Sequence, residues 1–183
     1  MRIFLTILFL AFLTAPASAI EVAGVTLEPA VTVNNSALKL NGHGIRKKLF
    51  IKVYIGSLYS TKRLTSATDA LADKGDKLIR MNFLYSKVEK EKIIEAFSEG
   101  FDNNSPNLVG SPDLKKFLSL FTADFIRGDV VDLVLGSDGT VSAKHNGKLL
   151  GSISSGKLAT AVLAIYLGEK PADDALKKGM LGG

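Results

Sequence analysis

The sequence of 183 residues contains no cysteine and only two histidines. The absence of cysteine excludes disulfides, thiol catalysis, CxxC redox chemistry and thiolate-bound zinc or iron–sulfur clusters. Two histidines, His43 and His145, are too few for a histidine-rich metal site. We therefore expect neither a metal nor a cofactor.

Two nucleotide and hydrolase signatures are also missing. No G-x-x-x-x-G-K-[ST] phosphate-binding loop occurs, and SSGKL around Gly156 is not the G-x-S-x-G nucleophile elbow. The net charge of +5 is modest, and no predicted helix carries a basic stripe with interleaved aromatic residues. The composition therefore predicts no nucleic-acid partner.

The N-terminus has the layout of a secretory signal peptide. Arg2 gives a positive start, the apolar stretch of Ile3 to Leu13 is shorter than the roughly 20 residues of a bilayer span, and Ala17-Ser18-Ala19 is a small-x-small cleavage site. An uncleaved membrane anchor is the alternative. We predict a signal peptide over residues 1–19 and secretion, to the periplasm if the source is bacterial, with no membrane span in the mature chain.

With 46% hydrophobic residues and no linker or repeat, residues 20–183 are expected to form one domain. Hydrophobic periodicity predicts the order of its elements. These are a β-rich stretch over 37–60, a short helix over 65–73, a strand over 77–84, helices after a capping box at 86–89 and after 111, three strands over 130–153, and helices over 155–167 and from 171. Strands in antiparallel blocks indicate an α+β protein.

The segment Asn41 to Lys48, NGHGIRKK, is the most unusual local feature. Two glycines would let the backbone approach a ligand, and the planar guanidinium of Arg46 could pair with a carboxylate or enolate. His43 lies between the glycines. The alternative is an ordinary solvated turn with surface charges.

Two further patterns bear on a ligand site. Leu49, Ile51, Val53 and Ile55 alternate with Phe50 and other residues, as expected of a half-buried strand. Five phenylalanines recur at helical spacing, and they either pack the core or line a pocket for a long apolar ligand. They are Phe97, Phe101, Phe117, Phe121 and Phe125.

Three segments resemble the chalcone isomerase-like family, and in particular its bacterial branch. They are GHGIRKKLFIKVYIGSLYS, DLVLGSDGTVSAKHNGKLLGSI and AIYLGEKPADDALKKGMLG. The resemblance extends from about Val22 to Gly182. It implies an open-faced β-sandwich, a large and mainly antiparallel sheet with helices packed on one side.

The same resemblance implies two possible activities. Plant members cyclise chalcones to flavanones, whereas plastid members bind fatty acids in the same cleft without catalysis. In both, an arginine that Arg46 matches anchors the anionic ligand. Plant isomerases have a threonine near the position of Tyr54, and a tyrosine and an asparagine near the first long helix. Residues 86–101 contain neither residue type, and Tyr85 lies just ahead of them.

The leading hypothesis is a monomeric binding protein for a small apolar acid, either a fatty acid or an aromatic acid. Arg46 would hold the acidic head and Tyr54 would hydrogen-bond it, with His43, Phe50 and Tyr85 as further ligand contacts. The alternatives are an intramolecular lyase of the chalcone–flavanone type, with Arg46 catalytic, and a structural or interaction domain that takes no ligand.

The spacing of the two main candidates sets a geometric condition. In one straight strand, Arg46 and Tyr54 would lie roughly 26 Å apart. They can share a ligand only if the chain folds back between them, and we predict a hairpin at Lys47-Lys48.

Overall fold

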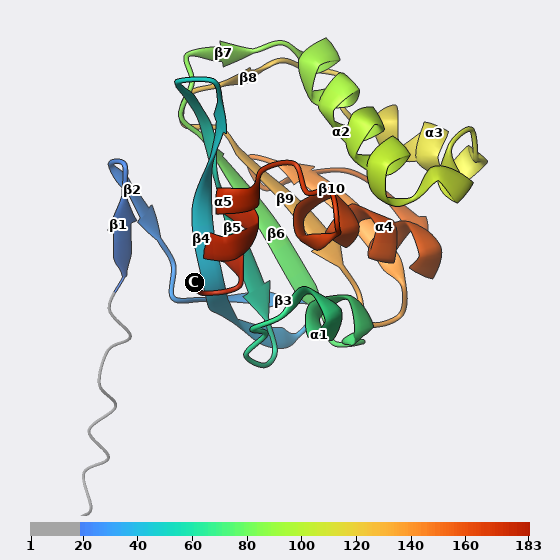
Figure 1. Cartoon of the computed structure of the whole chain (residues 1–183), viewed down its shortest axis with the longest axis horizontal. Coiled ribbons are helices and arrows are strands. Elements are labelled where there is room, and N and C mark those ends of the chain that lie inside the picture. The colour runs from blue at the N-terminus through green and yellow to red at the C-terminus, as the bar shows by residue number, and fades with distance from the viewer. Residues whose placement is uncertain (1–18) are drawn as a thin grey trace, which may run out of the picture.

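One antiparallel sheet of seven strands dominates the computed structural model, which describes residues 19–183. The predicted signal peptide therefore lies, but for its last residue, outside the described residues. The strand order is β11-β10-β9-β6-β5-β4-β3, and the main helices pack on one side of the sheet (Figure 1). This arrangement confirms the expected open-faced β-sandwich of the α+β class.

The element bounds agree with most of the predicted order. The strands of the large sheet are β3 (Ala30–Val33), β4 (Ser36–Lys48), β5 (Ile51–Ser60), β6 (Lys77–Phe83), β9 (Val130–Leu135), β10 (Thr140–His145) and β11 (Lys148–Ser154). Two small pairs are β1 (Ile20–Val22) with β2 (Val25–Leu27), and β7 (Lys87–Val88) with β8 (Phe125–Ile126). The helices are α1 (Ala67–Ala72), α2 (Lys90–Asn104), η1 (Pro106–Leu108), α3 (Pro112–Leu118), α4 (Gly156–Leu167) and α5 (Asp174–Met180).

Helix starts follow the local chemistry of the sequence. Ser66, Ser111 and Ser155 each cap a helix by accepting a hydrogen bond from a backbone N–H, as expected of N-cap serines. The predicted capping box at 86–89 is wrong. Residues 87–88 pair with β8 instead, and Glu89, the N-cap of α2, makes no side-chain capping bond.

The two faces of the sheet bury different clusters. The helix-covered face carries the main core, in which Ile79, Met81 and Leu133 are buried under α2 and α4. The opposite face carries a smaller cluster of Leu38, Tyr59, Leu78 and Val134. Because side chains alternate along a strand, the central strands β5, β6 and β9 supply residues to both clusters.

The chain folds back between Arg46 and Tyr54, as their spacing required. Arg46 pairs directly with Tyr54 across β4 and β5. The turn is formed by Leu49 and Phe50, so the predicted position at Lys47-Lys48 is two residues too early. The predicted strand alternation through Leu49 is wrong for the same reason. A β-bulge at Val53 separates the turn from the Arg46–Tyr54 pair.

Glycines of β4 give α5 its place on the sheet. A Cβ at Gly42 would lie 2.2 Å from the carbonyl oxygen of Gly179, and one at Gly44 would lie 2.9 Å from Leu176 Cα. A Cβ at Gly179 would in turn lie 2.2 Å from the carbonyl oxygen of His43. The two glycines expected to admit a ligand therefore admit a helix of the same chain.

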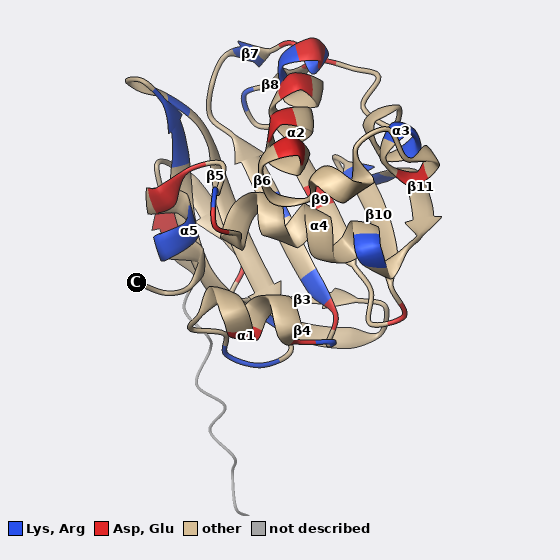
Figure 2. Ribbon diagram, turned by 45° about the vertical axis from the view of Figure 1, so that its right-hand side comes forward, with Lys and Arg blue, Asp and Glu red and all other residues tan. Residues whose placement is uncertain are grey.

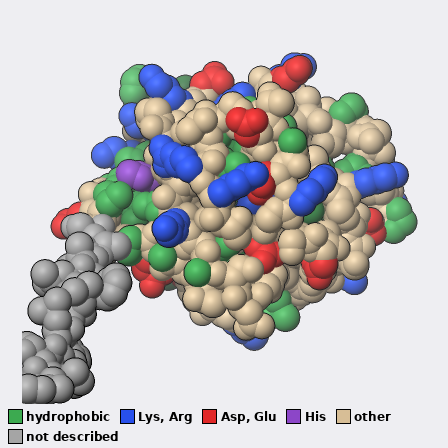
Figure 3. All heavy atoms as spheres, turned by 90° about the horizontal axis from the view of Figure 1, so that it is seen from below, with side chains coloured by type: hydrophobic (Ala, Val, Ile, Leu, Met, Phe, Trp, Pro, Cys, Tyr) green, Lys and Arg blue, Asp and Glu red, His purple; other side chains and the backbone are tan. Residues whose placement is uncertain are grey.

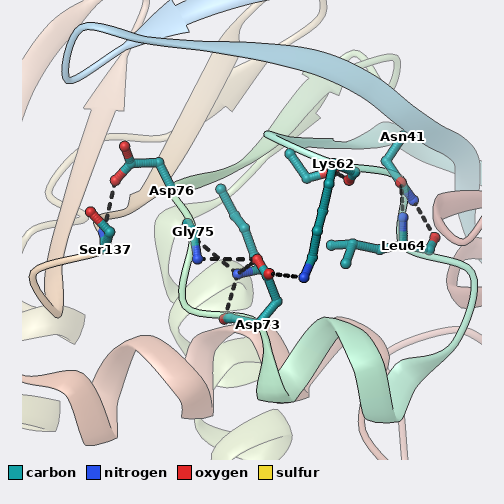
Figure 4. Close-up of polar contacts among 9 residues, drawn as sticks. Asn41, Lys62, Leu64, Asp73, Gly75, Asp76 and Ser137 are labelled. Atoms are coloured by element: carbon teal, nitrogen blue, oxygen red, sulfur yellow. Dashed lines mark hydrogen bonds and ion pairs between the residues drawn. The ribbon is translucent and has the colours of Figure 1, made fainter.

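Buried polar groups hold the lower end of β4 and β5 (Figure 4). The Asn41 amide nitrogen donates to the carbonyls of Leu64 and Met180, and its oxygen accepts from Leu64 N, all at 2.7–2.8 Å. Lys77, also buried, donates to the carbonyls of Asp73 and Gly75 and pairs with the Asp73 carboxylate at 2.8 Å. All three ammonium protons are thus used, which indicates a structural role.

Charge is dispersed over the face seen in Figure 3, where Lys and Arg side chains lie singly among acidic and uncharged ones. Within residues 19–183, no helix combines the length and apolar character needed to cross a membrane. The same residues contain no cluster of three or more His, Asp or Glu side chains that could hold a metal ion.

The glycine contacts lead to a first prediction. Gly42→Ala should lower the free energy of unfolding by about 2–3 kcal/mol, because the new methyl meets backbone atoms that cannot rotate away. Gly156→Ala is the matched control, since a Cβ there has no atom within 4 Å. Denaturant unfolding of both variants checks this. Equal stabilities would show that α5 does not need the glycine.

Candidate functional site

Arg46 lies on the helix-covered face of the sheet, at the edge of the main core. Gly42 and Gly44 contact α5, and Arg46 follows on the same face by strand alternation. Its guanidinium carbon lies 5.8 Å from the centre of the Tyr54 ring. This is within the distance of a cation–π interaction.

Tyr54 continues the site across the sheet. Only 2% of its surface is exposed, and its ring lies 5.6 Å from that of Phe83, its partner on β6. Phe83 stacks in turn on Phe125 at 4.9 Å. The Arg46 side chain thus ends a row of aromatic rings.

A small cavity opens between this row and the helices. Its volume is about 10 Å³, which is room for one water molecule. Its lining combines one cation, two phenols and apolar side chains. The lining residues are Arg46, Tyr54, Met81, Ile93, Ala96, Phe97, Ile165, Tyr166 and Ala172.

Tyr166 is a polar residue of the site that sequence reasoning missed. It is buried near the end of α4, and its hydroxyl donates to the Met81 sulfur at 3.3 Å. A thioether is a weak acceptor, so the hydroxyl retains capacity for a stronger partner. A tyrosine within the apolar run ATAVLAIYL was the available signal, because a buried phenol requires a polar partner.

Asp173 is the second residue that sequence reasoning missed. Its carboxylate caps α5 by accepting from Leu176 N and also accepts from Lys47 N at 3.1 Å. The start of α5 is thereby fixed to the strand position next to Arg46. No ion pair joins Arg46 to Asp173 or to another carboxylate of residues 19–183.

The electrostatics keep the cation charged and the phenols protonated. Burial opposes the charge of Arg46, but Tyr54, Tyr166 and Asp173 raise its pKa above the ordinary value. Burial raises the pKa of Tyr54, although the positive charge of Arg46 acts in the opposite direction. Burial, followed by the proximity of Tyr54, raises the pKa of Tyr166 well above its usual value. The site therefore offers one cation and two hydroxyl donors, which suits a carboxylate.

The other predicted contacts are not brought to Arg46. His43 lies between Gly42 and Gly44, so its side chain points to the opposite face of the sheet. Phe50 is 99% exposed at the hairpin turn. Tyr85, 40% exposed, shares a surface hollow with Phe50. Of the five phenylalanines, Phe97 lines the cavity and the others are buried in the main core.

The model of the chalcone isomerase-like family matches residues 19–182. The chain belongs to the chalcone isomerase-like family. Fatty-acid-binding protein 1 of Arabidopsis thaliana is 29% identical over 108 residues, which are 56% of this chain and 39% of that protein. The chain thus spans less than half the length of this relative.

A solved structure shares the fold. The crystal structure of a fatty-acid binding protein from Arabidopsis thaliana has a TM-score of 0.69 and 23% sequence identity. The match covers 90% of this chain and 96% of the other.

The raised phenol pKa values predict the alkaline behaviour of the protein. Burial raises the pKa of Tyr54 and Tyr166, and that of Tyr59 to about 12. At pH 10.5, above the pKa of about 10 of an unfolded tyrosine, the folded protein should show less phenolate absorbance than the unfolded protein. Because a raised pKa favours the protonated folded state, stability should fall as the pH rises above about 10.

Ultraviolet difference spectra and thermal unfolding across this pH range provide the measurement. Equal phenolate absorbance of the folded and unfolded protein at pH 10.5 would contradict the burial of the tyrosines.

Proposed function

We propose that the protein binds a fatty acid, with its carboxylate on Arg46, without catalysing a reaction on it. The observation that carries the proposal is a guanidinium beside two buried phenols, unpaired with any carboxylate of residues 19–183. The similar sequence and the similar structure are both of fatty-acid-binding protein 1 of Arabidopsis thaliana, whose name supports this ligand class.

The roles follow from the chemistry of each group. Arg46 supplies charge and a planar pair of donors, while Tyr54 and Tyr166 each offer a hydroxyl to the same carboxylate. The hydrocarbon chain then lies among Ile93, Phe97 and their neighbours. Burial of apolar surface contributes about 25 cal/mol per Å² removed from water. The hydrocarbon chain of the ligand is therefore expected to supply most of the affinity.

Binding requires the cleft to open. Pockets for small-molecule ligands have volumes of about 300–1,000 Å³, far more than the roughly 10 Å³ of this cavity. We propose that the first half of α2, which carries Ile93 and Phe97, moves away from the sheet. Its N-cap residue Glu89 makes no side-chain capping bond, and one hydrogen bond, from Lys90 N to the Asp124 carboxylate, holds its start. Its end is held by close contact of Gly100 with Ile165 and by two hydrogen bonds between Asn104 and Lys170.

The closed cleft also favours a second candidate, a structural or interaction domain that takes no ligand. Titration of the protein with dodecanoate separates the two candidates. Saturable binding supports the first, and its absence supports the second.

Arg46→Ala should weaken dodecanoate binding about 10- to 100-fold, the cost of losing charge-assisted hydrogen bonds to a carboxylate. The measurement is calorimetric titration of the parent and variant. Lys115→Ala, an exposed cation on α3, is the matched control and should bind as the parent does. Dodecanoate methyl ester adds a second comparison.

The parent should prefer the acid to the ester, and Arg46→Ala should lose most of that preference. An Arg46→Ala variant that binds dodecanoate with unchanged affinity would refute the assigned role.

We also propose that the protein belongs to the secreted bacterial branch of the family and acts in the periplasm. The N-terminal pattern ending at Ala17-Ser18-Ala19 supports this. Expression of the full chain in a Gram-negative host should yield a periplasmic product whose intact mass is that of residues 20–183. Ala19→Pro should block this processing. A cytoplasmic product of full mass from the unaltered chain would exclude secretion.

A further inference from the structure

The turn of the β4–β5 hairpin presents two large apolar side chains to solvent. Leu49 is 87% exposed and Phe50 is 99% exposed. The hairpin tip projects from one end of the molecule, the same end at which β7 and β8 lie (Figure 1). Neither side chain contributes burial to the core, so packing does not explain their presence.

The backbone of this turn makes its composition more unusual. Leu49 has a φ of 57°, in the left-handed region that glycine adopts readily and leucine does not. Two-residue hairpin turns normally place glycine or asparagine at such a position. Folding alone would therefore favour glycine, and a leucine here indicates selection for an exposed apolar group.

Cations surround the two apolar side chains. Lys47, Lys48 and Lys52 are exposed, and none forms an ion pair with a carboxylate of the described chain. In Figure 2 the hairpin strands are blue just behind the tip, and the nearest acidic segments lie on α2 and beside α5. The hairpin tip thus presents two exposed apolar side chains, and three exposed lysines flank them in the adjoining strands.

The adjacent surface has the same character. Ile126 is 54% exposed, and exposed Arg127 lines a hollow together with Phe50 and Lys52. The two carboxylates nearest in sequence to Ile126 and Arg127 already have partners. Asp124 forms an ion pair with Lys87, and Asp129 accepts a hydrogen bond from Ile126 N. The apolar and cationic character therefore extends beyond the hairpin.

We propose that this tip docks on the surface of an anionic lipid bilayer, with Leu49 and Phe50 inserted and the lysines at the level of the headgroups. Interfacial segments with exposed apolar side chains backed by Lys and Arg bind anionic membranes through both contributions. A projecting point suits a deformable lipid surface, and its unpaired cations complement anionic headgroups. The proposal does not depend on fatty-acid binding, although docking would place the Arg46 cleft close to a lipid source.

Co-sedimentation with vesicles tests the proposal. The protein is purified from its host, its N-terminus is identified by intact mass, and every variant carries the same N-terminus. The vesicles contain either equal amounts of phosphatidylcholine and phosphatidylglycerol or phosphatidylcholine alone. The parent should sediment with the anionic vesicles, bind the neutral ones more weakly, and dissociate as salt rises.

Two tip variants should lose this binding. Leu49→Gly combined with Phe50→Ser should lower partition at least about tenfold, because both inserted side chains are removed. Lys47→Gln combined with Lys48→Gln should lower it about fivefold for each lysine. Melting temperatures should not fall, since none of these side chains is buried.

Matched controls lie elsewhere on the surface. Leu149→Ser removes a 55% exposed leucine from β11, and Lys115→Gln with Lys116→Gln removes two exposed cations from α3. Both should sediment as the parent does. A parent that fails to bind anionic vesicles, or controls that lose as much binding as the tip variants, would overturn the proposal.

Fatty-acid binding and docking can fail separately. Arg46→Ala should lose affinity for dodecanoate and keep its sedimentation with vesicles, whereas the tip variants should behave in the opposite way.

Discussion

The close contact between α5 and the glycines of β4 is the constraint on which the site depends. Backbone touches backbone there, so the helix has one position on the strand. That position brings Asp173 to Lys47 N and Ala172 to the cavity. Ala172, in the loop just before α5, thereby closes the cavity beside Arg46. The contact of Gly42 and Gly44 with α5 therefore determines how much space the guanidinium of Arg46 has.

The sheet supplies the complementary part of the site. The register of β4 and β5 sets Arg46 opposite Tyr54, and that of β5 and β6 sets Tyr54 opposite Phe83. Burial keeps the phenols protonated, and the phenols and Asp173 keep the arginine charged. The site proposed to bind an anion is thus built from three neighbouring strands and two helices, with no residue in a strained conformation at the site itself.

Local signals in the sequence predicted the fold well and the site in part. The hydrophobic patterns that predicted β6, β9 and β11 are short-range features, and the structure confirms these strands. The resemblance to the family singled out Arg46 and Tyr54. Tyr166 and Asp173 were missed because their positions depend on long-range packing. The turn at Leu49 was missed because it contains none of the residues that usually mark one.

The bulge at Val53 has a consequence for variation among related sequences. Its carbonyl accepts from Leu84 N and Tyr85 N, so the strand is held to its neighbour between the tip and the Arg46–Tyr54 pair. Side chains beyond this point can be exchanged without turning Arg46 out of the cleft. An added or deleted residue cannot be absorbed so easily, because a shift of one residue exchanges the two faces of a strand. The fold of the site should therefore tolerate a substitution at the tip more easily than a change in the length of the hairpin.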